Sequence, residues 1–194
     1  MARRLSGGLS SGVGLRCIMS LRPSSSSSSS RKRLLIAWHS MTGGSQQMAE
    51  AAYRGAVSES GSVDVSLLHA SKIDPRHVVD SDGFIFVTPE NLAAMSGLMK
   101  DMFDRSYYHA LGKLNGRPYS VMICAGSDGE NAARQVARIA TGWRLKSVSP
   151  PLIVITRAQT PEAILAAKVI SPVDLERCED AGKAIAAGLG LGVF

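Results

Sequence analysis

The segment Ser40-Met41-Thr42-Gly43-Gly44-Ser45 carries residue types that are suited to holding a phosphate group. It supplies three hydroxyls, two glycines that let the backbone approach a ligand, and a run of backbone N–H groups where a helix is expected to begin. The segment has no lysine and matches neither GxxxxGK(S/T) nor GxGxxG, which disfavours a Walker-type nucleotide triphosphatase and a dinucleotide Rossmann site. Its neutral donors favour a monophosphate, and the alternative is an ordinary helix cap by Thr42 or Ser45.

Two further segments follow apolar runs and offer polar groups. Pro89-Glu90-Asn91-Leu92 comes after the first of these runs, which Pro89 is expected to stop because proline cannot continue a strand ladder. Backbone N–H and C=O groups of 90–93 then become available for binding. Ala125-Gly126-Ser127-Asp128-Gly129 follows the other run, and its glycines permit a tight turn or the close approach of a planar ligand. The alternative is a plain turn in which Ser127 or Asp128 caps the next helix.

The remaining reactive residue types show no catalytic or metal-binding spacing. Two charged pairs at i,i+4, Lys100/Asp104 and Asp101/Arg105, are interpreted as surface salt bridges. The three cysteines contain no CxxC and the four histidines no HExxH, so neither a disulfide scaffold, a zinc site nor another metal site is indicated. We assign no catalytic side chain. The neighbouring apolar residues are interpreted as core: Met95, Met99, Met102 and Phe103.

The chain that positions these segments alternates apolar runs with helical patterns. The runs predict strands over 34–38, 63–68, 83–88, 118–124 and 152–156. Spacings of three and four predict helices over 46–58, 96–114, 131–143 and 173–189. This order predicts a single α/β domain with a doubly wound, five-stranded parallel sheet. In such folds ligands bind at the carboxyl ends of the strands, where all three segments should lie.

The charge of the chain is concentrated at one end. Of 22 Lys+Arg and 16 Asp+Glu in 194 residues, seven basic residues and no acid lie in 1–33. The part from 34 to 194 therefore has 22 − 7 = 15 basic residues against 16 acidic ones, a formal charge of −1. A near-neutral globule argues against nucleic-acid binding. No apolar run approaches the roughly 20 residues that a membrane span needs.

Residues 1–33 are expected to form a disordered Ser/Arg-rich tail, and 34–194 the folded domain. The tail contains seven consecutive serines, Ser24–Ser30, and lacks the apolar area that would offset the entropy of ordering it. Its acid-free composition is typical of an organelle transit peptide. The alternative is an over-extended start, with translation beginning at Met19 or later. We therefore expect a cytoplasmic protein, with organelle targeting as the alternative.

The quoted segments resemble the flavodoxin-like superfamily. Ser40, Thr42, Gly43 and Ser45 are similar to its S-x-T-G-x-(S/T) FMN phosphate loop, and Gly44 departs from it where flavodoxins often have Asn. Residues 89–105, PENLAAMSGLMKDMFDR, are similar to the P-x-(Y/N)-x4-S-G-x-(L/M)-K-x-(F/M)-(F/I)-D-R segment of NAD(P)H-dependent FMN reductase and quinone reductase relatives. The likeness extends over about 34–190.

The resemblance implies FMN as the cofactor, with NAD(P)H as its reductant. It places the phosphate on residues 40–45 and the flavin ring between Pro89–Leu92 and Gly126–Asp128. The second and third segments contain no aromatic residue, which predicts an open flavin face. We therefore expect an oxidoreductase that passes hydride or electrons to a quinone, a flavin or a similar small acceptor. A homo-oligomer would fit reductases of this type.

Two alternatives remain open at this point. One is a flavodoxin-type electron carrier without turnover of its own, although carriers are typically acidic and stack aromatic side chains on the ring. The other is a domain that keeps the fold and has lost the flavin, which the departure at Gly44 keeps open.

Overall fold

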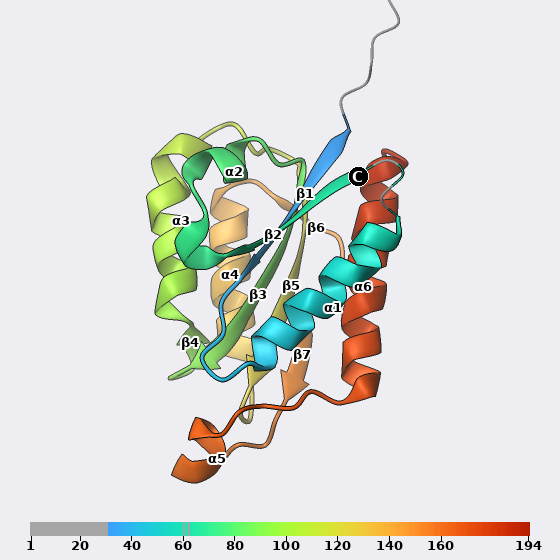
Figure 1. The fold of residues 1–194 in the computed structure, drawn as a ribbon. Coiled ribbons are helices and arrows are strands. Elements are labelled where there is room, and N and C mark those ends of the chain that lie inside the picture. Colours follow the sequence, from blue (N-terminus) through green and yellow to red (C-terminus); the bar gives the residue numbers. More distant parts are fainter. Residues whose placement is uncertain (1–30, 60, 62) are drawn as a thin grey trace, which may run out of the picture.

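The computed structural model describes residues 31–59, 61 and 63–194, in which a parallel sheet forms the centre (Figure 1). Its strands are β1 (Lys32–Trp38), β2 (Val63–His69), β3 (Gly83–Asn91), β5 (Pro118–Ala125), β6 (Lys146–Ser147) and β7 (Leu152–Ile155). The order is β2-β1-β3-β5, and both β6 and β7 pair in parallel with the outer edge of β5. Pro150 and Pro151 interrupt this edge, since neither can donate to the ladder. The predicted doubly wound, five-stranded sheet is confirmed, with its last strand split in two.

Helices cover both faces of the sheet (Figure 1). α1 (Gly44–Ser58) and α6 (Pro172–Gly190) pack side by side on one face, and α3 (Gly97–Ala110) and α4 (Glu130–Gly142) lie on the other. Glycines make the α1–α6 contact close, because a Cβ on Gly55 would lie 1.9 Å from the Glu179 carbonyl oxygen. The expected helix over 96–114 ends earlier, at Ala110, shortly before Gly112 adopts a φ of 70°.

Two hydrophobic clusters lie on opposite sides of the sheet because the β1 side chains alternate between them. Leu34 and Ile36 join the cluster under α1 and α6, whereas Leu35 and Ala37 join the one under α3 and α4. A strand that is buried on both faces reads as a continuous apolar run, which is why this strand was predictable. The residues expected as core in and before α3 are buried: Met95, Met99, Met102 and Phe103.

The first strand begins before the expected domain boundary. Lys32 and Arg33 belong to β1 and pair with Val63 and Asp64 of β2, so the sheet starts two residues before position 34. The remainder of the predicted tail, 1–30, lies outside the described residues. None of the helices within the described ranges is long and apolar enough to cross a membrane.

Three short helices and two short strands were not anticipated from the sequence. They are a 3-10 helix (Ala70–Lys72), α2 (Pro75–Val79), β4 (Ala94–Met95), the two-residue strand β6 and α5 (Pro161–Leu165). α2 and α5 both begin with a capping side chain followed by proline, Asp74-Pro75 and Thr160-Pro161. A capping residue followed by proline is a sequence signal for the start of a helix.

Candidate functional site

Four segments meet at the carboxyl ends of the parallel strands, at the end of the sheet where α5 projects (Figure 1). They are residues 39–43 after β1, 92–93 after β3, 126–129 after β5 and 156–171 after β7. The strand order changes direction between β1 and β3, so this edge also holds the switch point of the fold. The three predicted segments are therefore brought together, and a fourth joins them.

The first segment ends in a helix N-terminus that no side chain caps. Gly43 is the N-cap of α1 with a φ of 86°, a left-handed conformation that favours glycine. Its N–H donates to Ser40 Oγ at 3.0 Å, and no side chain hydrogen bond closes the cap. The alternative of a cap by Thr42 or Ser45 is therefore wrong. The amides of residues 44–46 have no acceptor within the helix and point to where an anion would bind.

Two buried polar atoms beside this N-terminus lack a hydrogen-bond partner. Ser45 is 1% exposed, and within residues 31–59, 61 and 63–194 neither its Oγ nor Nδ1 of the buried His39 makes a hydrogen bond of regular geometry. Burial, and secondarily the repulsion from His69, lowers the pKa of His39, so its imidazole is neutral at pH 7. An unpaired buried hydroxyl costs free energy unless a ligand uses it. In the first turn of α1, Ser45 Oγ fits a donor to a phosphate oxygen.

Gly44 is explained by the cysteine at the end of β5. A Cβ at position 44 would lie 2.5 Å from Cys124 Sγ and 3.2 Å from Lys168 Cβ. Cys124 is buried, and burial raises its pKa, although the charge of Lys168 and the neighbouring Ser45 hydroxyl act in the opposite direction. The residue that departs from the flavodoxin pattern is thus required by packing. An asparagine here would collide with the thiol.

Residues 156–171, which we call the strap, hold the first segment in place. The sequence did not predict this contact. Lys168 N donates to the Thr42 carbonyl at 2.8 Å. The side chain of Gln47 donates to the Lys168 carbonyl at 2.6 Å and accepts from Ile170 N at 3.2 Å. Lys168 Nζ donates to three carbonyls at the end of α5, those of Ala163, Ile164 and Ala166. Lys168 therefore joins the loop to α5, with its backbone bonded to Thr42 and its ammonium group to the end of α5.

The second segment is a tight hairpin, and this corrects the expected end of the strand. β3 continues through Pro89 to Asn91 and pairs in antiparallel fashion with β4. Proline is tolerated because β1 pairs only as far as Val87, which leaves one side of β3 free there. Leu92 and Ala93 form the turn with φ values of 50° and 57°. Such values are unfavourable for residues with a Cβ, and strain of this kind is concentrated at functional sites.

Side chains fasten this hairpin to the third segment. Glu90 Oε2 accepts from Gly129 N at 2.9 Å, and Asn131 Nδ2 donates to the Ala93 carbonyl at 2.5 Å. Glu90 thus joins the hairpin to the third segment through its carboxylate, and no sequence pattern indicated that role. The hairpin tip remains outside this network, since Asn91 and Leu92 are exposed.

The third segment leaves its polar side chains free. Gly129 is the N-cap of α4 with a φ of 85° and no side-chain cap. Ser127 and Asp128 are exposed, so the alternative in which one of them caps α4 is wrong. Gly126 lies against the strap, because a Cβ there would be 3.0 Å from the Ala158 carbonyl oxygen. The segment therefore forms an open polar rim facing the hairpin.

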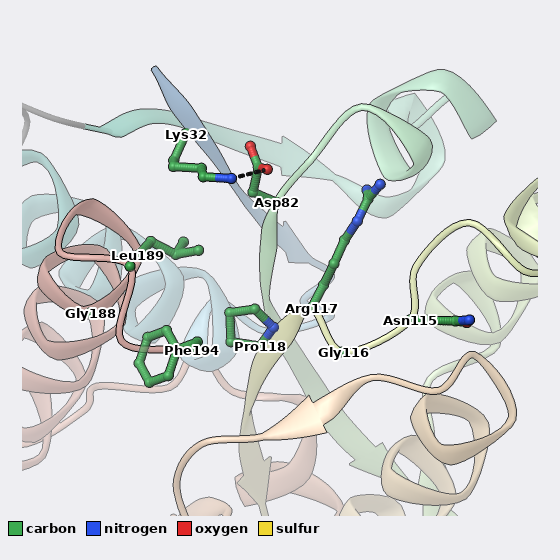
Figure 2. Close-up of a pocket in the computed structure, with 10 residues that line it drawn as sticks. Lys32, Asp82, Asn115, Gly116, Arg117, Pro118, Gly188, Leu189 and Phe194 are labelled. Atoms are coloured by element: carbon green, nitrogen blue, oxygen red, sulfur yellow. Dashed lines mark hydrogen bonds and ion pairs between the residues drawn. The ribbon is translucent and has the colours of Figure 1, made fainter. Parts of the chain in front are cut away.

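A hollow lies at the opposite end of the sheet (Figure 2). It measures about 230 Å³ and is lined by the starts of β1 and β5 and the end of α6. Lys32 and Asp82 form an ion pair across it at 3.0 Å, and Arg117 donates to the carbonyls of Val79 and Ser81. Its charged groups are bonded to the protein itself, so we do not assign it a ligand.

Comparisons with known proteins agree with this geometry. Residues 75–160 match the family model described as NADPH-dependent FMN reductase. A NAD(P)H dehydrogenase (quinone) from Acidithiobacillus ferrooxidans is 33% identical, over 47% of this chain and 56% of that protein. A flavodoxin from Clostridium saccharobutylicum is 32% identical, over 50% and 61%. The chain spans about half the length of the curated relatives it matches.

Solved structures extend the likeness to most of the fold. An archaeal flavodoxin superposes with a TM-score of 0.65 at 17% identity, over 81% of this chain and 98% of that one. At this identity the match shows the fold alone. Together with the sheet order and the family match over 75–160, it confirms the resemblance to flavodoxin-like proteins and to NAD(P)H-dependent FMN reductases.

Proposed function

We propose that this chain is an FMN-binding, NAD(P)H-dependent oxidoreductase that passes electrons to a quinone, a flavin or a similar small acceptor. The observation that carries the proposal is the uncapped N-terminus of α1 with the unpaired, buried hydroxyl of Ser45 in its first turn. An anion at this place would accept from the free amides and gain from the helix dipole. The name of the matched family and that of one relative, an NAD(P)H-dependent FMN reductase from Schizosaccharomyces pombe, support FMN as that ligand.

Different segments of the chain would bind the phosphate and the ring of the cofactor. Thr42, Gly43, Gly44 and Ser45 would surround the phosphate, with Ser40 keeping the Gly43 amide in place. When bound, the flavin accepts a hydride from the nicotinamide and releases electrons to the acceptor. The protein would position the ring between the hairpin, residues 89–92, and the open rim, residues 126–128.

The open rim favours turnover of small molecules. Neither the hairpin nor the rim contains an aromatic side chain, and Phe103 is 2% exposed in the core. Trp38 packs its ring edge-on against His69, with centroids 4.9 Å apart. A flavin face that no aromatic ring covers is available for stacking by a nicotinamide or a quinone, as hydride transfer requires.

The runner-up is an electron carrier of the flavodoxin type, which the relative from Clostridium supports. Carriers use charge to dock on redox partners. The formal charge of −1 over residues 34–194 supplies little such steering. Steady oxidation of NADPH or NADH by the FMN-loaded protein with a soluble quinone separates the two functions, because a carrier would show no turnover.

The proposal is tested first by titrating the purified protein with FMN and following flavin fluorescence. We expect saturable binding, and we expect Thr42→Val to weaken it by about 1–3 kcal/mol if the hydroxyl bonds the phosphate. Thr141→Val is the control, because Thr141 bonds only within α4, at the Ala137 carbonyl. Failure of the wild-type protein to bind FMN would refute the proposed function.

A further inference from the structure

A groove of about 790 Å³ runs along α4 beside the hairpin. Its lining comes from β4, the first turn of α3 and one face of α4. Met95 and Ile139 supply apolar surface, and Lys100, Arg134 and Arg138 supply positive charge. The volume lies within the usual range of small-molecule sites.

The positive charge of the groove is only partly neutralised. Lys100 is paired with Asp104 at 2.6 Å, but the lining itself contains no carboxylate. Arg134 and Arg138 stand one helical turn apart and take no part in the ion pairs formed within 31–59, 61 and 63–194. Like charges at this spacing destabilise a helix. A polyanionic ligand would remove that repulsion.

The groove begins at the hairpin that we assign to the flavin ring. Asn131 bonds the Ala93 carbonyl, and Gln135 Oε1 accepts from Met95 N at 3.1 Å, so α4 and the hairpin form one wall. From Asn131 to Arg138 the helix rises about 10 Å, at roughly 1.5 Å per residue. This length suits a ligand whose one end reaches the flavin while phosphates further along meet the two arginines.

We propose that the groove binds the adenosine half of the nicotinamide dinucleotide and selects NADPH over NADH. Arg134 would contact the diphosphate, and Arg138, further from the hairpin, the 2′-phosphate. Planar guanidinium groups match phosphate oxygens in pairs, and Met95 and Ile139 offer the adenine an apolar surface. The hydride-donor role of this ligand rests on the proposed function, whereas nucleotide binding in the groove does not.

Calorimetric titration of the purified protein with adenosine 2′,5′-bisphosphate and with adenosine 5′-monophosphate tests the binding directly. We expect the bisphosphate to bind at least tenfold more tightly. Arg138→Gln should weaken bisphosphate binding about tenfold and leave the monophosphate nearly unchanged. Arg54→Gln is the matched control, because Arg54 is an exposed arginine on α1 that pairs with Glu179. Equal affinities for the two nucleotides, or an equal loss in both variants, would overturn the inference.

Gly97 allows the groove to be blocked without disturbing the core. It lines the groove, and a Cβ there would meet no atom within 4 Å. Gly97→Leu should abolish binding of both nucleotides while circular dichroism and the unfolding midpoint stay close to wild type. Nucleotide binding that survives in this folded variant would contradict the assignment. Wild-type protein that binds neither nucleotide, for example because a second copy covers the groove, would also overturn it.

These results are separable from the fate of the proposed function. Nucleotide binding in a protein that takes no FMN would sustain the groove and refute the oxidoreductase. Arg138→Gln could instead leave the ratio of KM for NADPH to KM for NADH unchanged in an active FMN enzyme. That result would sustain the oxidoreductase and refute the groove. If the groove selects NADPH, the substitution raises the KM for NADPH about tenfold and that for NADH little.

Discussion

The two ends of the sheet differ in how their polar groups are bonded, and the hollow of Figure 2 lies at the amino end. At the amino end, Asp82 accepts from Lys32 Nζ and from Arg33 N, and Arg117 is held by carbonyls. At the carboxyl end, Ser45 Oγ and His39 Nδ1 are buried without a hydrogen-bond partner in the described part of the chain. In the function that we propose, the end with unfinished hydrogen bonding binds the ligand, and the hollowed end with satisfied charges does not.

Positive φ values occur at both ends of the sheet, but the two residues with such values that line the amino-end hollow, Gly116 and Gly192, are glycines. The carboxyl end holds Gly43 and Gly129 with positive φ and, less favourably, Leu92 and Ala93. Conformations of this kind cost free energy and persist where surrounding structure enforces them. Here the enforcing contacts come from the bond of Asn131 to the Ala93 carbonyl and from the pairing of β3 with β4. The carboxyl end is therefore built at some expense of stability.

The largest effect on this comparison is expected from Gly44→Ala. The added methyl group would lie 2.5 Å from Cys124 Sγ, so we expect a loss of about 1–3 kcal/mol in unfolding free energy and weaker FMN binding. Urea unfolding and FMN titration measure the two effects. Gly142→Ala is the control, because its Cβ meets open space within α4, and it should stabilise slightly.

The steric collision between a residue 44 side chain and Cys124 should also be relieved by shortening Cys124. Cys124→Ala removes the sulfur, so the double variant should lose less than the two single losses added together. Strict additivity would show that the thiol does not constrain the loop.

Ser45→Ala should separate stability from binding at the carboxyl end. Removing a buried hydroxyl without a partner should leave the unfolding free energy of the ligand-free protein unchanged or slightly raised. The same change should weaken FMN binding by about 1–3 kcal/mol. Urea unfolding measures the change in stability of this variant, and FMN titration measures its change in affinity. A clear loss of stability without a change in FMN affinity would contradict the assigned role.

The smallest effect is expected at the amino end, from Asp82→Asn. Burial alone would raise the pKa of Asp82, but the Arg33 amide, Lys32 and Arg117 outweigh it, so the pKa lies below its ordinary 3.8. A carboxylate whose pKa is lowered in the folded state stabilises the protein above its unfolded-state pKa. This stabilisation is lost as the pH falls through the folded-state pKa. We expect Asp82→Asn to cost less than about 1 kcal/mol at pH 7 because the pair is half exposed.

Urea unfolding across pH measures the Asp82 contribution. The difference between Asp82→Asn and wild type should shrink as the pH is lowered past 3.8, and FMN affinity should not change. A difference that grows on acidification would contradict the sign. A change in FMN affinity would break the contrast between the two ends of the sheet.

Local patterns were enough to predict most elements and the edge at which the site lies. The apolar runs of β1 and β3 indicated strands buried on both faces, and parallel strands place their following loops at one edge. The same patterns gave a wrong strand end where the pairing of neighbouring strands allowed a proline within the strand. Pro89 was expected to end β3, but β1 had already ended, and the strand continues into a hairpin.

The apolar stripe of α3 shows a second limit. Met99, Met102 and Phe103 are buried as predicted, whereas the apolar Leu98 and Leu111 within the same predicted helix, 96–114, are 40% and 50% exposed. Spacing defines a face of a helix, whereas the depth of each residue depends on where neighbouring elements end. α3 stops at Ala110, so Leu111 lies beyond the packed surface.

By itself the sequence determined the fold class, the neutral, hydroxyl-bearing loop 40–45 and its place before a helix, because periodicity and turn chemistry are local. Only the tertiary structure decided that Lys168 and Gln47 strap this loop, that Cys124 requires Gly44, and that Glu90 joins two loops. It also decided that Arg134 and Arg138 line a groove. These contacts join residues far apart in the chain, and their geometry depends on how the helices and strands pack, which no local pattern encodes.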